Sequence, residues 1–256
     1  MNQMTCDIAQ RFTKWTLASL VLMTNSVYAQ ESVVQISQFD GPSETAPSPW
    51  KVVRLSKSVA PTQYRIIAWD GVLAVEANAN RSMALFARQI TVNLQATPIL
   101  CWRWRIDAPL LAADMKTKAG DDYAARVYVA LSLPPSALSW GTKMKLGVAR
   151  SIYGDLVPDA ALNYVWDNRY PVGTLQPNAY TDRTQMIVTQ SGKSNAGKWV
   201  TQRRDVLADA ISAFGDHRYT TNLIAVAADT DNTGESARSG FADLHFVERS
   251  ANCHFE

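Results

Sequence analysis

The sequence predicts a mostly β protein, a single-domain β-sandwich of jelly-roll type with one short helix in its C-terminal half. Two stretches carry this prediction because their apolar side chains recur every second residue, which is the repeat of a strand. In residues 101–107, CWRWRID, one face holds Trp102, Trp104 and Ile106. In residues 126–133, RVYVALSL, valines and leucines alternate in the same way. Each stretch therefore has one face that can line a core.

Further short strands, separated by turn residues, continue along the chain and favour a sandwich. Asp70-Gly71 is a strong hairpin signal, and Pro98 and Pro134-Pro135 interrupt the pattern. The predicted strands are residues 33–39, 50–55, 64–69, 72–77, 82–87, 90–94, 101–107, 126–133, 161–166, 186–190, 199–203, 222–228 and 241–247.

One helix is predicted at residues 205–214, DVLADAISAF, because apolar residues recur there at helical spacing. Asp205 is a suitable N-cap and Gly215 a suitable stop. Residues 136–152 fit neither period, so a short helix or an irregular excursion is expected. Residues 167–184 are polar and turn-rich with two prolines, which indicates a long loop, and such loops are often functional.

The first 29 residues have the features of a secretory signal peptide. Arg11 and Lys14 precede the apolar run 15–23, and small or polar residues lead to Ala29, where we expect cleavage. A membrane anchor is disfavoured because the run is about half of the ~20 residues that span a bilayer. Residues 30–256 are expected to form one domain, periplasmic or secreted, with no stable membrane insertion.

Charge and cysteine content narrow the choice of partners and compartment. The chain has 25 Lys and Arg against 23 Asp and Glu and no basic run, so no nucleic-acid partner is expected. Cys101 and Cys253 remain after removal of the leader, which contains Cys6. They either pair in an oxidising compartment, with roughly 4 to 5 kcal/mol of stabilisation in the simple loop model, or stay as two thiols. Both states remain open because the sequence does not show how close their Cα atoms lie.

Seven segments resemble the motifs of an exported bacterial family of unknown function. The segments are CWRWRID, GDDYAARVYV, NYVWDN, NAYTDR, MIVTQSG, WVTQRRDV and AVAADTDNTG. They are similar to the family's WRWRxD, GDD before ARVYV, YVW, an RD pair before a helix, and TDTDNTG. Ala228 stands where the family commonly has Thr or Met. The resemblance covers almost the whole mature chain; it implies a periplasmic β-sandwich and supplies no activity.

A second likeness covers only the two ends of the mature chain. ISQFDG, SPWKVV and GVLAVEANANRSMALFAR near the start, and SGFADLHF near the end, resemble the galactose-binding-like jelly rolls of secreted carbohydrate-binding modules. This likeness implies a carbohydrate partner.

Three groups of side chains are candidates for ligand binding, and the first is basic. Arg103, Arg105 and Arg126 would lie side by side if their strands were neighbours. Guanidinium groups bind carboxylates and sulfates through paired hydrogen bonds, so this face would suit an acidic glycan. The alternative is that these arginines pair with nearby aspartates.

The second group consists of two acidic loops, GDD at 120–122 and DTDN at 229–232. Their oxygen atoms suit Ca²⁺. The second loop begins like an EF-hand, but its twelfth position is Gly240 rather than Glu, which excludes that motif. We predict no metal site and no cofactor, with a structural calcium ion as the alternative to simple tight turns.

The third group lies in or beside the predicted long loop and comprises Trp166, Tyr170 and Tyr180, with Asn168 and Asn178 among them. Sugar rings stack on aromatic side chains while amides bind sugar hydroxyls, so this mixture suits a glycan cleft. The alternative is that Trp166 belongs to the core and that the tyrosines only hold the loop.

The predicted function is that of an exported, non-catalytic binding protein for a carbohydrate or other cell-envelope ligand. One alternative is a glycan-acting hydrolase or lyase that uses cleft carboxylates such as Asp122 and Asp231. Another is a structural or interaction protein of the envelope. No zinc spacing of histidines and no GxSxG motif is present, and no catalytic residue is assigned. The predicted ligand-binding residues are Arg103, Arg105, Arg126, Asp122, Trp166, Asn168, Tyr180, Asp231 and Asn232.

Overall fold

The computed structural model describes residues 1, 32–153 and 157–256 of the chain, which is mostly β. Its two helices are α1 (Trp140–Tyr153) and α2 (Val206–Phe214), and single 3₁₀ turns occupy Lys118–Gly120 and Pro135–Ala137. The strands are β1 (Val34–Gln35), β2 (Lys51–Val53), β3 (Gln63–Trp69), β4 (Val72–Asn80), β5 (Leu85–Gln89), β6 (Ile99–Ile106), β7 (Tyr123–Ser132), β8 (Ala160–Asp167), β9 (Leu175–Asn178), β10 (Thr181–Ser191), β11 (Val200–Asp205), β12 (Thr220–Asp229) and β13 (Ser236–Val247).

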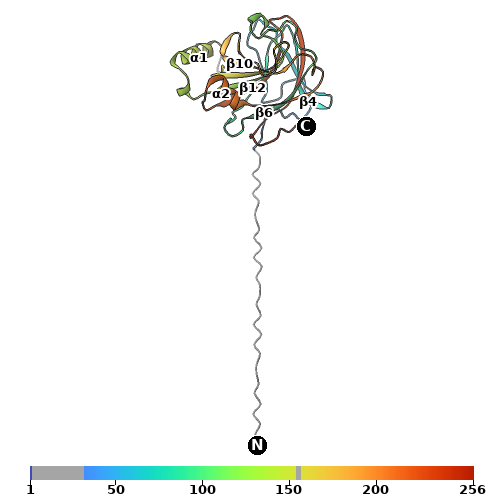
Figure 1. Ribbon diagram of the computed structural model, residues 1–256. Coiled ribbons are helices and arrows are strands. Elements are labelled where there is room, and N and C mark those ends of the chain that lie inside the picture. The colour runs from blue at the N-terminus through green and yellow to red at the C-terminus, as the bar shows by residue number, and fades with distance from the viewer. Residues whose placement is uncertain (2–31, 154–156) are drawn as a thin grey trace. The chain divides into compact units, whose positions relative to one another are not determined.

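These strands form two sheets that pack face to face (Figure 1). The first sheet has the order β11-β6-β13-β4-β3, and β1 pairs with β13. The second has the order β2-β5-β12-β7-β8-β10-β9. The pairs are antiparallel except that of β8 with β10. The predicted β-sandwich is confirmed.

Aromatic side chains join the two sheets at the centre of the sandwich. Trp102 and Trp104 of β6 are completely buried, as their alternation with arginine predicts. The ring of Trp102 lies 5.4 Å from that of Tyr164, and the ring of Trp104 lies 5.6 Å from that of Trp166, both on β8 of the second sheet. Burying such large side chains is the main stabilising contribution in a core of this kind.

The predicted helix is confirmed as α2, and its ends follow the expected chemistry. The carboxylate of Asp205 accepts a hydrogen bond from the backbone N of Ala208 at 2.9 Å. Gly215 ends the helix with φ of 95°, a value that favours glycine.

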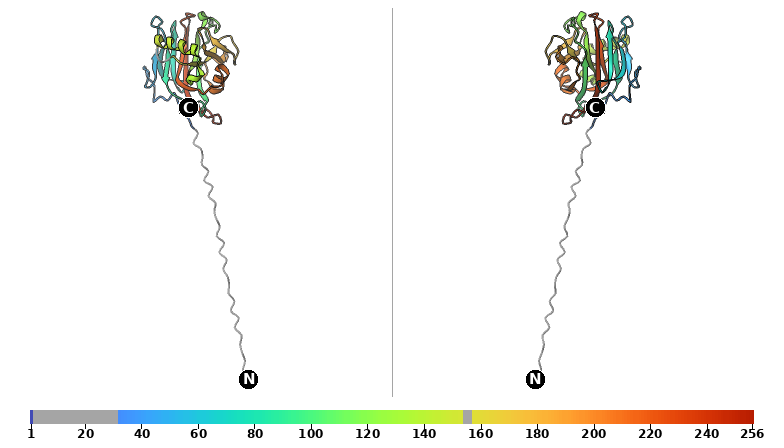
Figure 2. Two further views of the ribbon diagram at one scale, coloured as in Figure 1. Left: turned by 90° about the vertical axis from the view of Figure 1, so that its left-hand side faces the viewer. Right: turned by 90° about the vertical axis from the view of Figure 1, so that its right-hand side faces the viewer.

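Of the two alternatives for residues 136–152, the structure shows the helix, α1, whose period is unclear in the sequence because most of its described side chains face solvent rather than a core. The left-hand side view shows α1 on the outside of the body, in front of the strands (Figure 2). The predicted loop 167–184 also contains β9 and the start of β10. Residues 90–94 form only an isolated bridge between Asn93 and Thr220 rather than the predicted strand.

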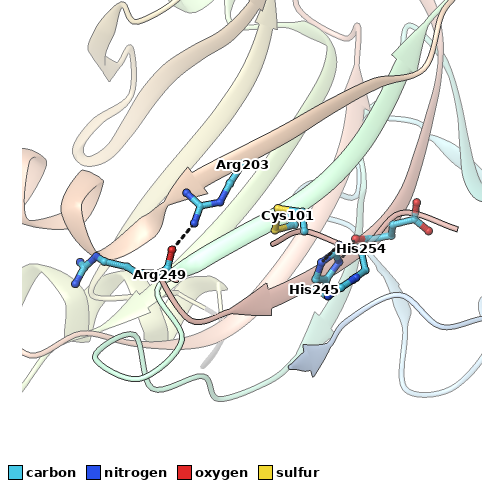
Figure 3. The surroundings of a disulfide bond; sticks show 7 residues. Cys101, Arg203, His245, Arg249 and His254 are labelled. Atoms are coloured by element: carbon cyan, nitrogen blue, oxygen red, sulfur yellow. Dashed lines mark hydrogen bonds between the residues drawn. A yellow bond between two sulfur atoms is a disulfide. The ribbon is translucent and has the colours of Figure 1, made fainter. Parts of the chain in front are cut away.

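A disulfide between Cys101 and Cys253 decides the open question of the two cysteines, with Cα atoms 5.7 Å apart (Figure 3). It ties the segment after β13 to β6. The backbone N of His254 also donates to Nε2 of His245 at 3.1 Å, so Nδ1 of His245 carries the proton and donates to the carbonyl of Asp243. Burial lowers the pKa of His245 and keeps this neutral form.

The predicted signal peptide, residues 1–29, lies outside the described residues except for Met1. Residues Glu31–Glu256 form one compact unit. Neither helix in the described part of the chain is long and apolar enough to cross a membrane.

Candidate functional site

Four aspartates gather where the loop before β7 meets the loop after β12, and we call Asp121, Asp122, Asp229 and Asp231 the acidic cluster. The two loops meet because β7 and β12 are antiparallel neighbours, with Tyr123 paired to Asp229. One carboxylate oxygen from each of Asp122, Asp229 and Asp231 lies within 4.8 Å of the others. The structure thus brings together the two acidic loops that the sequence singled out.

The fully buried carboxylates of this cluster are held by donors of the chain itself. Asp122 is 0% exposed and accepts hydrogen bonds from Nδ2 of Asn232 at 3.2 Å and from the backbone N of Thr233 at 2.6 Å. Asp229 is 2% exposed and accepts from the backbone N of Tyr123 at 3.2 Å. Its second oxygen forms an ion pair with Nη2 of Arg126 at 2.8 Å.

Asp121 is held by a residue from another part of the second sheet. Nδ2 of Asn178, at the end of β9, lies 3.0 Å and 2.9 Å from its two carboxylate oxygens. Asp121 and Asn178 were not among the predicted ligand-binding residues. The GDD motif was a signal for Asp121, whereas nothing local to Asn178 indicated its partner.

Asp231 differs from the other three aspartates of the cluster. Its side chain is half-buried and accepts no hydrogen bond from another side chain in the described part of the chain. Asp231 is therefore the carboxylate of the cluster that is accessible to an external donor.

Burial raises the pKa values of Asp121, Asp229 and Asp231, because desolvation penalises the charged form. The rise is large for Asp229 even though Arg126 opposes it. For Asp231, the neighbouring Asp122 adds to the rise. Arg126 is the one guanidinium that pairs with a carboxylate of the described acidic cluster, so the negative charge of the cluster is only partly balanced. The raised pKa values mean that Asp121, Asp229 and Asp231 retain their protons to higher pH than an ordinary aspartate does.

Tyr180 forms the exposed rim of the site. Its side chain is 56% exposed, and Oη lies 3.2 Å from Oδ1 of Asn232 and 3.3 Å from the carbonyl of Lys118. The single hydroxyl proton is shared between these two acceptors. The ammonium of Lys118 lies 5.2 Å from the ring centroid, and the backbone N of Tyr180 donates to Oδ1 of Asn178 at 3.0 Å. Lys118 and Asn232, two residues distant in sequence, and the neighbouring Asn178 thus hold Tyr180 in place.

Gly120, the glycine of the GDD motif, allows the loop below Tyr180 to fold back so that Gly120 lies against Asp114. A Cβ atom at Gly120 would lie 2.6 Å from the backbone N of Asp114. Those two residues are joined by a hydrogen bond from Asp114 N to Gly120 O of 2.8 Å. A side chain at position 120 is therefore incompatible with this loop, which carries Lys118 and Asp121.

The cluster does not fit a calcium ion. Ca²⁺ takes six to eight oxygen ligands from carboxylates, carbonyls and waters. Here the oxygens of Asp122 already accept from Asn232 and Thr233, and Asp229 is engaged by Tyr123 and Arg126. The guanidinium of Arg126 also already supplies, beside Asp229, the positive charge that a bound cation would provide.

The predicted arginine face is wrong in one respect, since its three members do not lie side by side. Arg103 and Arg105 belong to β6 in the first sheet, whereas Arg126 belongs to β7 in the second. The chain between β6 and β7 crosses from one sheet to the other, so the two strands are not paired. Only Arg126 joins the acidic cluster.

Arg103 and Arg105 lie on the outer face of the first sheet, and each has a carboxylate partner. Arg103 pairs with Asp243, and Arg105 pairs with Asp70. The guanidinium carbon of Arg105 lies 4.2 Å from the ring centroid of Trp69, so this side chain is also stacked. Their charge is compensated within the protein.

Trp166 and Asn168 also lie apart from the acidic cluster. Trp166 is 1% exposed in the core, and its Nε1 donates to the carbonyl of Gly192 at 3.0 Å. Nδ2 of Asn168 donates to the carbonyls of Leu111 at 3.1 Å and Ala113 at 3.0 Å, which holds the chain between β6 and β7. Asn168 also lines a surface cavity of about 390 Å³ together with Pro109, Leu111, Arg169, Gly192 and Lys193.

Of the nine predicted ligand-binding residues, the structure therefore brings five together. They are Asp122, Arg126, Tyr180, Asp231 and Asn232.

Comparison with known proteins identifies a family but no activity. Residues 48–245 match the family described as "Protein of unknown function (DUF3047)". No curated protein sequence matches the chain.

Among solved structures, a thermostable cellulase derived from Cel12A of Rhodothermus marinus is 12% identical, with a TM-score of 0.42, over 85% of this chain and 100% of that one. A metagenome-derived glycoside hydrolase family 12 endoglucanase is 10% identical, also with a TM-score of 0.42, over 85% and 99% of the two chains. At these values neither the fold nor any residue role is argued from these enzymes.

Proposed function

Since this chain belongs to the DUF3047 family of proteins of unknown function, its own side chains have to indicate its role, and we propose that it is a non-catalytic binding protein for a neutral carbohydrate of the cell envelope. The ligand contacts the rim formed by Tyr180, Asn232 and Asp231. Asp231, the accessible carboxylate of the acidic cluster, supplies hydrogen-bond acceptors for sugar hydroxyls.

The observation that carries the proposal is the exposed but fixed ring of Tyr180. An aromatic ring that is 56% exposed offers a surface for the C–H face of a sugar. Its hydroxyl is held by Asn232 and by the carbonyl of Lys118, so the ring loses little conformational entropy when a ligand binds. Such preorganisation favours recognition.

The charge of the site favours a neutral ligand over an acidic one. Asp121, Asp122, Asp229 and Asp231 outnumber the paired Arg126 and the nearby Lys118. A carboxylate or sulfate on the ligand would be repelled, whereas hydroxyl groups donate hydrogen bonds to carboxylates. The arginines that would have suited an acidic glycan lie on the first sheet and are paired there.

Burial argues against the hydrolase alternative. A glycosidase needs two carboxyl groups that both reach the scissile bond. Asp122 and Asp231 are close enough, but Asp122 is 0% exposed and both of its oxygens accept hydrogen bonds from the protein. Asp229 is 2% exposed and paired with Arg126. Within the described acidic cluster, only Asp231 is accessible, and one carboxylate does not provide both acid and base.

We also propose that the protein acts in the periplasm or outside the cell after cleavage near Ala29. The sequence of the first 29 residues supports this location. The disulfide between Cys101 and Cys253 is consistent with it, because disulfides persist in oxidising compartments.

The test is calorimetric titration of residues 30–256 with neutral oligosaccharides, namely cello-, xylo- and chito-oligosaccharides, and with polygalacturonate and alginate as acidic probes. We expect binding of at least one neutral series and none of the acidic probes. Tyr180→Ala should weaken binding about tenfold, or about 1.4 kcal/mol, and Tyr180→Phe should weaken it less because the ring remains.

Trp140→Ala, which removes an exposed aromatic ring on α1, is the matched control and should bind as the wild type does. New reducing ends in the incubated oligosaccharides would overturn the non-catalytic assignment in favour of a hydrolase. Absence of binding to every probe would overturn the carbohydrate proposal and favour the interaction-protein alternative.

A further inference from the structure

Helix α1 presents an apolar stripe to solvent. Trp140, Met144 and Val148 are spaced by four residues and lie on one side of the helix, with exposed fractions of 79%, 54% and 58%. Leu146, at 7%, is on the opposite side and packs on the body. The helix is therefore apolar on both sides, and the outer side has no partner among the described residues.

The space around this stripe is open. A Cβ atom added at Gly141 or Gly147 would meet no atom within 4 Å outside the backbone of the helix itself. Figure 2 shows α1 on the outside of the body in its left-hand view. A flat surface can thus approach the helix.

Local hydrogen bonds and an ion pair hold α1 in place. Oγ of Ser139 accepts from the backbone N of Thr142 at 3.1 Å, which caps the first turn. Near the other end, Nη2 of Arg150 pairs with Asp159 at 2.9 Å, and Nε of Arg150 donates to the carbonyl of Val157 at 3.0 Å. The stripe is a preformed surface.

The charge beside the stripe is positive. Helix α1 contains Lys143, Lys145 and Arg150 and no acidic residue. Both lysines are exposed, and neither forms an ion pair with a described carboxylate. Among the described acidic residues, Asp159 pairs with Arg150 of the helix and is 8% exposed.

We propose that α1 docks on the surface of an anionic phospholipid bilayer. Trp140, Met144 and Val148 enter the boundary between headgroups and acyl chains, while Lys143 and Lys145 contact the anionic headgroups. An exposed apolar stripe beside lysines is the pattern of helices that lie in this interface. A second copy of the chain fits less well, because facing α1 helices would bring four lysines together. The contact is peripheral, since neither described helix can span the bilayer.

The experiment is flotation of residues 30–256 with vesicles of phosphatidylglycerol and phosphatidylcholine at 3:7, compared with pure phosphatidylcholine. We expect binding only to the anionic vesicles and at least tenfold weaker binding at high salt. Trp140→Ser and the double variant Lys143→Gln with Lys145→Gln should each reduce binding at least tenfold.

Two matched controls separate this proposal from general stickiness and from the carbohydrate site. Leu111→Ser removes another exposed apolar side chain, 82% exposed, and should leave vesicle binding unchanged. Tyr180→Ala disrupts the proposed carbohydrate rim and should also leave it unchanged, so either proposal can fail without the other.

Equal binding to both kinds of vesicle, or no binding to either, would overturn the proposal. A dimer in light scattering that Trp140→Ser dissociates, without vesicle binding, would overturn it in favour of a second copy as the occupant.

Discussion

A carboxylate oxygen of Asp122 lies within 4.8 Å of a carboxylate oxygen of Asp231. Asp122 is completely buried, whereas Asp231 is half-buried. The buried member is held by Asn232 and Thr233, whereas Asp231 accepts no side-chain hydrogen bond among the described residues. The pair therefore combines a fixed acceptor, Asp122, with an accessible one, Asp231. The electrostatic repulsion between the two carboxylates should be measurable as a dependence of stability on pH.

Replacing Asp231 by Asn should stabilise the protein at neutral pH. Burial, with the charge of Asp122, raises the pKa of Asp231, so the folded state holds this proton more tightly than the unfolded state. The wild type therefore loses stability as pH rises through the folded pKa, and Asp231→Asn avoids that loss. Because Asp231 is partly exposed, solvent screening limits the gain to about 1–3 °C in melting temperature at pH 7.5.

The sign of this effect can be checked by thermal melts between pH 4 and pH 8. The advantage of Asp231→Asn should shrink as the pH is lowered towards and below the ordinary pKa of an aspartate, because Asp231 then becomes protonated in both the folded and the unfolded state. Asp216→Asn, at an exposed position in the turn after α2, serves as the control and should show no such trend. A variant that is less stable than the wild type at pH 7.5 would contradict the assignment.

Gly120→Ala should disturb the loop that supports Tyr180. The added methyl group would lie 2.6 Å from the backbone N of Asp114, and backbone cannot yield as a flexible side chain can. We expect a loss of about 1–3 kcal/mol in the free energy of unfolding, or about 3–10 °C in melting temperature. Carbohydrate binding should weaken with it, because Lys118 and Asp121 are on this loop.

Gly41→Ala is the matched control, since a Cβ atom at Gly41 would meet nothing within 4 Å. Its melting temperature should be close to that of the wild type. Equal melting temperatures for Gly120→Ala and Gly41→Ala would show that the glycine of the GDD motif is not required for close packing.

Loss of the disulfide should destabilise the protein substantially. Cys101 and Cys253 are separated by 152 residues, and closing so long a loop gives roughly 5 kcal/mol in the simple entropic model. Native bridges commonly contribute less, so Cys253→Ala should lower stability by about 3–5 kcal/mol, or about 6–20 °C in melting temperature. A reductant should lower the wild type similarly and have no further effect on Cys253→Ala. An unchanged wild type under full reduction would show that the bridge is energetically minor.

Chelation should leave the protein unchanged. Three of the four carboxylates of the acidic cluster, those of Asp121, Asp122 and Asp229, are occupied by Arg126 or by amide donors, so we expect no bound Ca²⁺ to be needed to hold the loops. We expect the melting temperature with EDTA to equal that with added Ca²⁺ to within about 1 °C. Stabilisation that saturates with Ca²⁺ would instead demonstrate a metal site by the linkage of binding to folding.

Local sequence patterns determined most of the secondary structure. The alternation of Trp102 and Trp104 with arginines predicted a half-buried strand, and both indoles are completely buried. The capped apolar repeat at residues 205–214 predicted α2. These features depend on the period of a strand or helix, which is written into neighbouring residues.

The candidate site was predictable only in part. Asp122, Asp231 and Asn232 belong to turn motifs that are visible in the sequence, and Tyr180 is an aromatic residue in a predicted loop. Asp121 and Asn178 are 57 residues apart, and their hydrogen bonds exist only because β9 joins the edge of the second sheet. For residues 136–152 the sequence left a short helix and an irregular excursion open, because the outward stripe of α1 removes the amphipathic pattern by which a helix on a core is recognised.

The sequence by itself thus determined the alternating strands, the helix at 206–214 and the acidic turns, because each follows from contacts between residues close in the chain. Only the tertiary structure decided that Arg103 and Arg105 face away from Arg126, that Trp166 is in the core, and that Tyr180 lies over the aspartates. Those relationships depend on which strands pair and where the chain crosses between sheets, and the period of a strand carries no information about its neighbour.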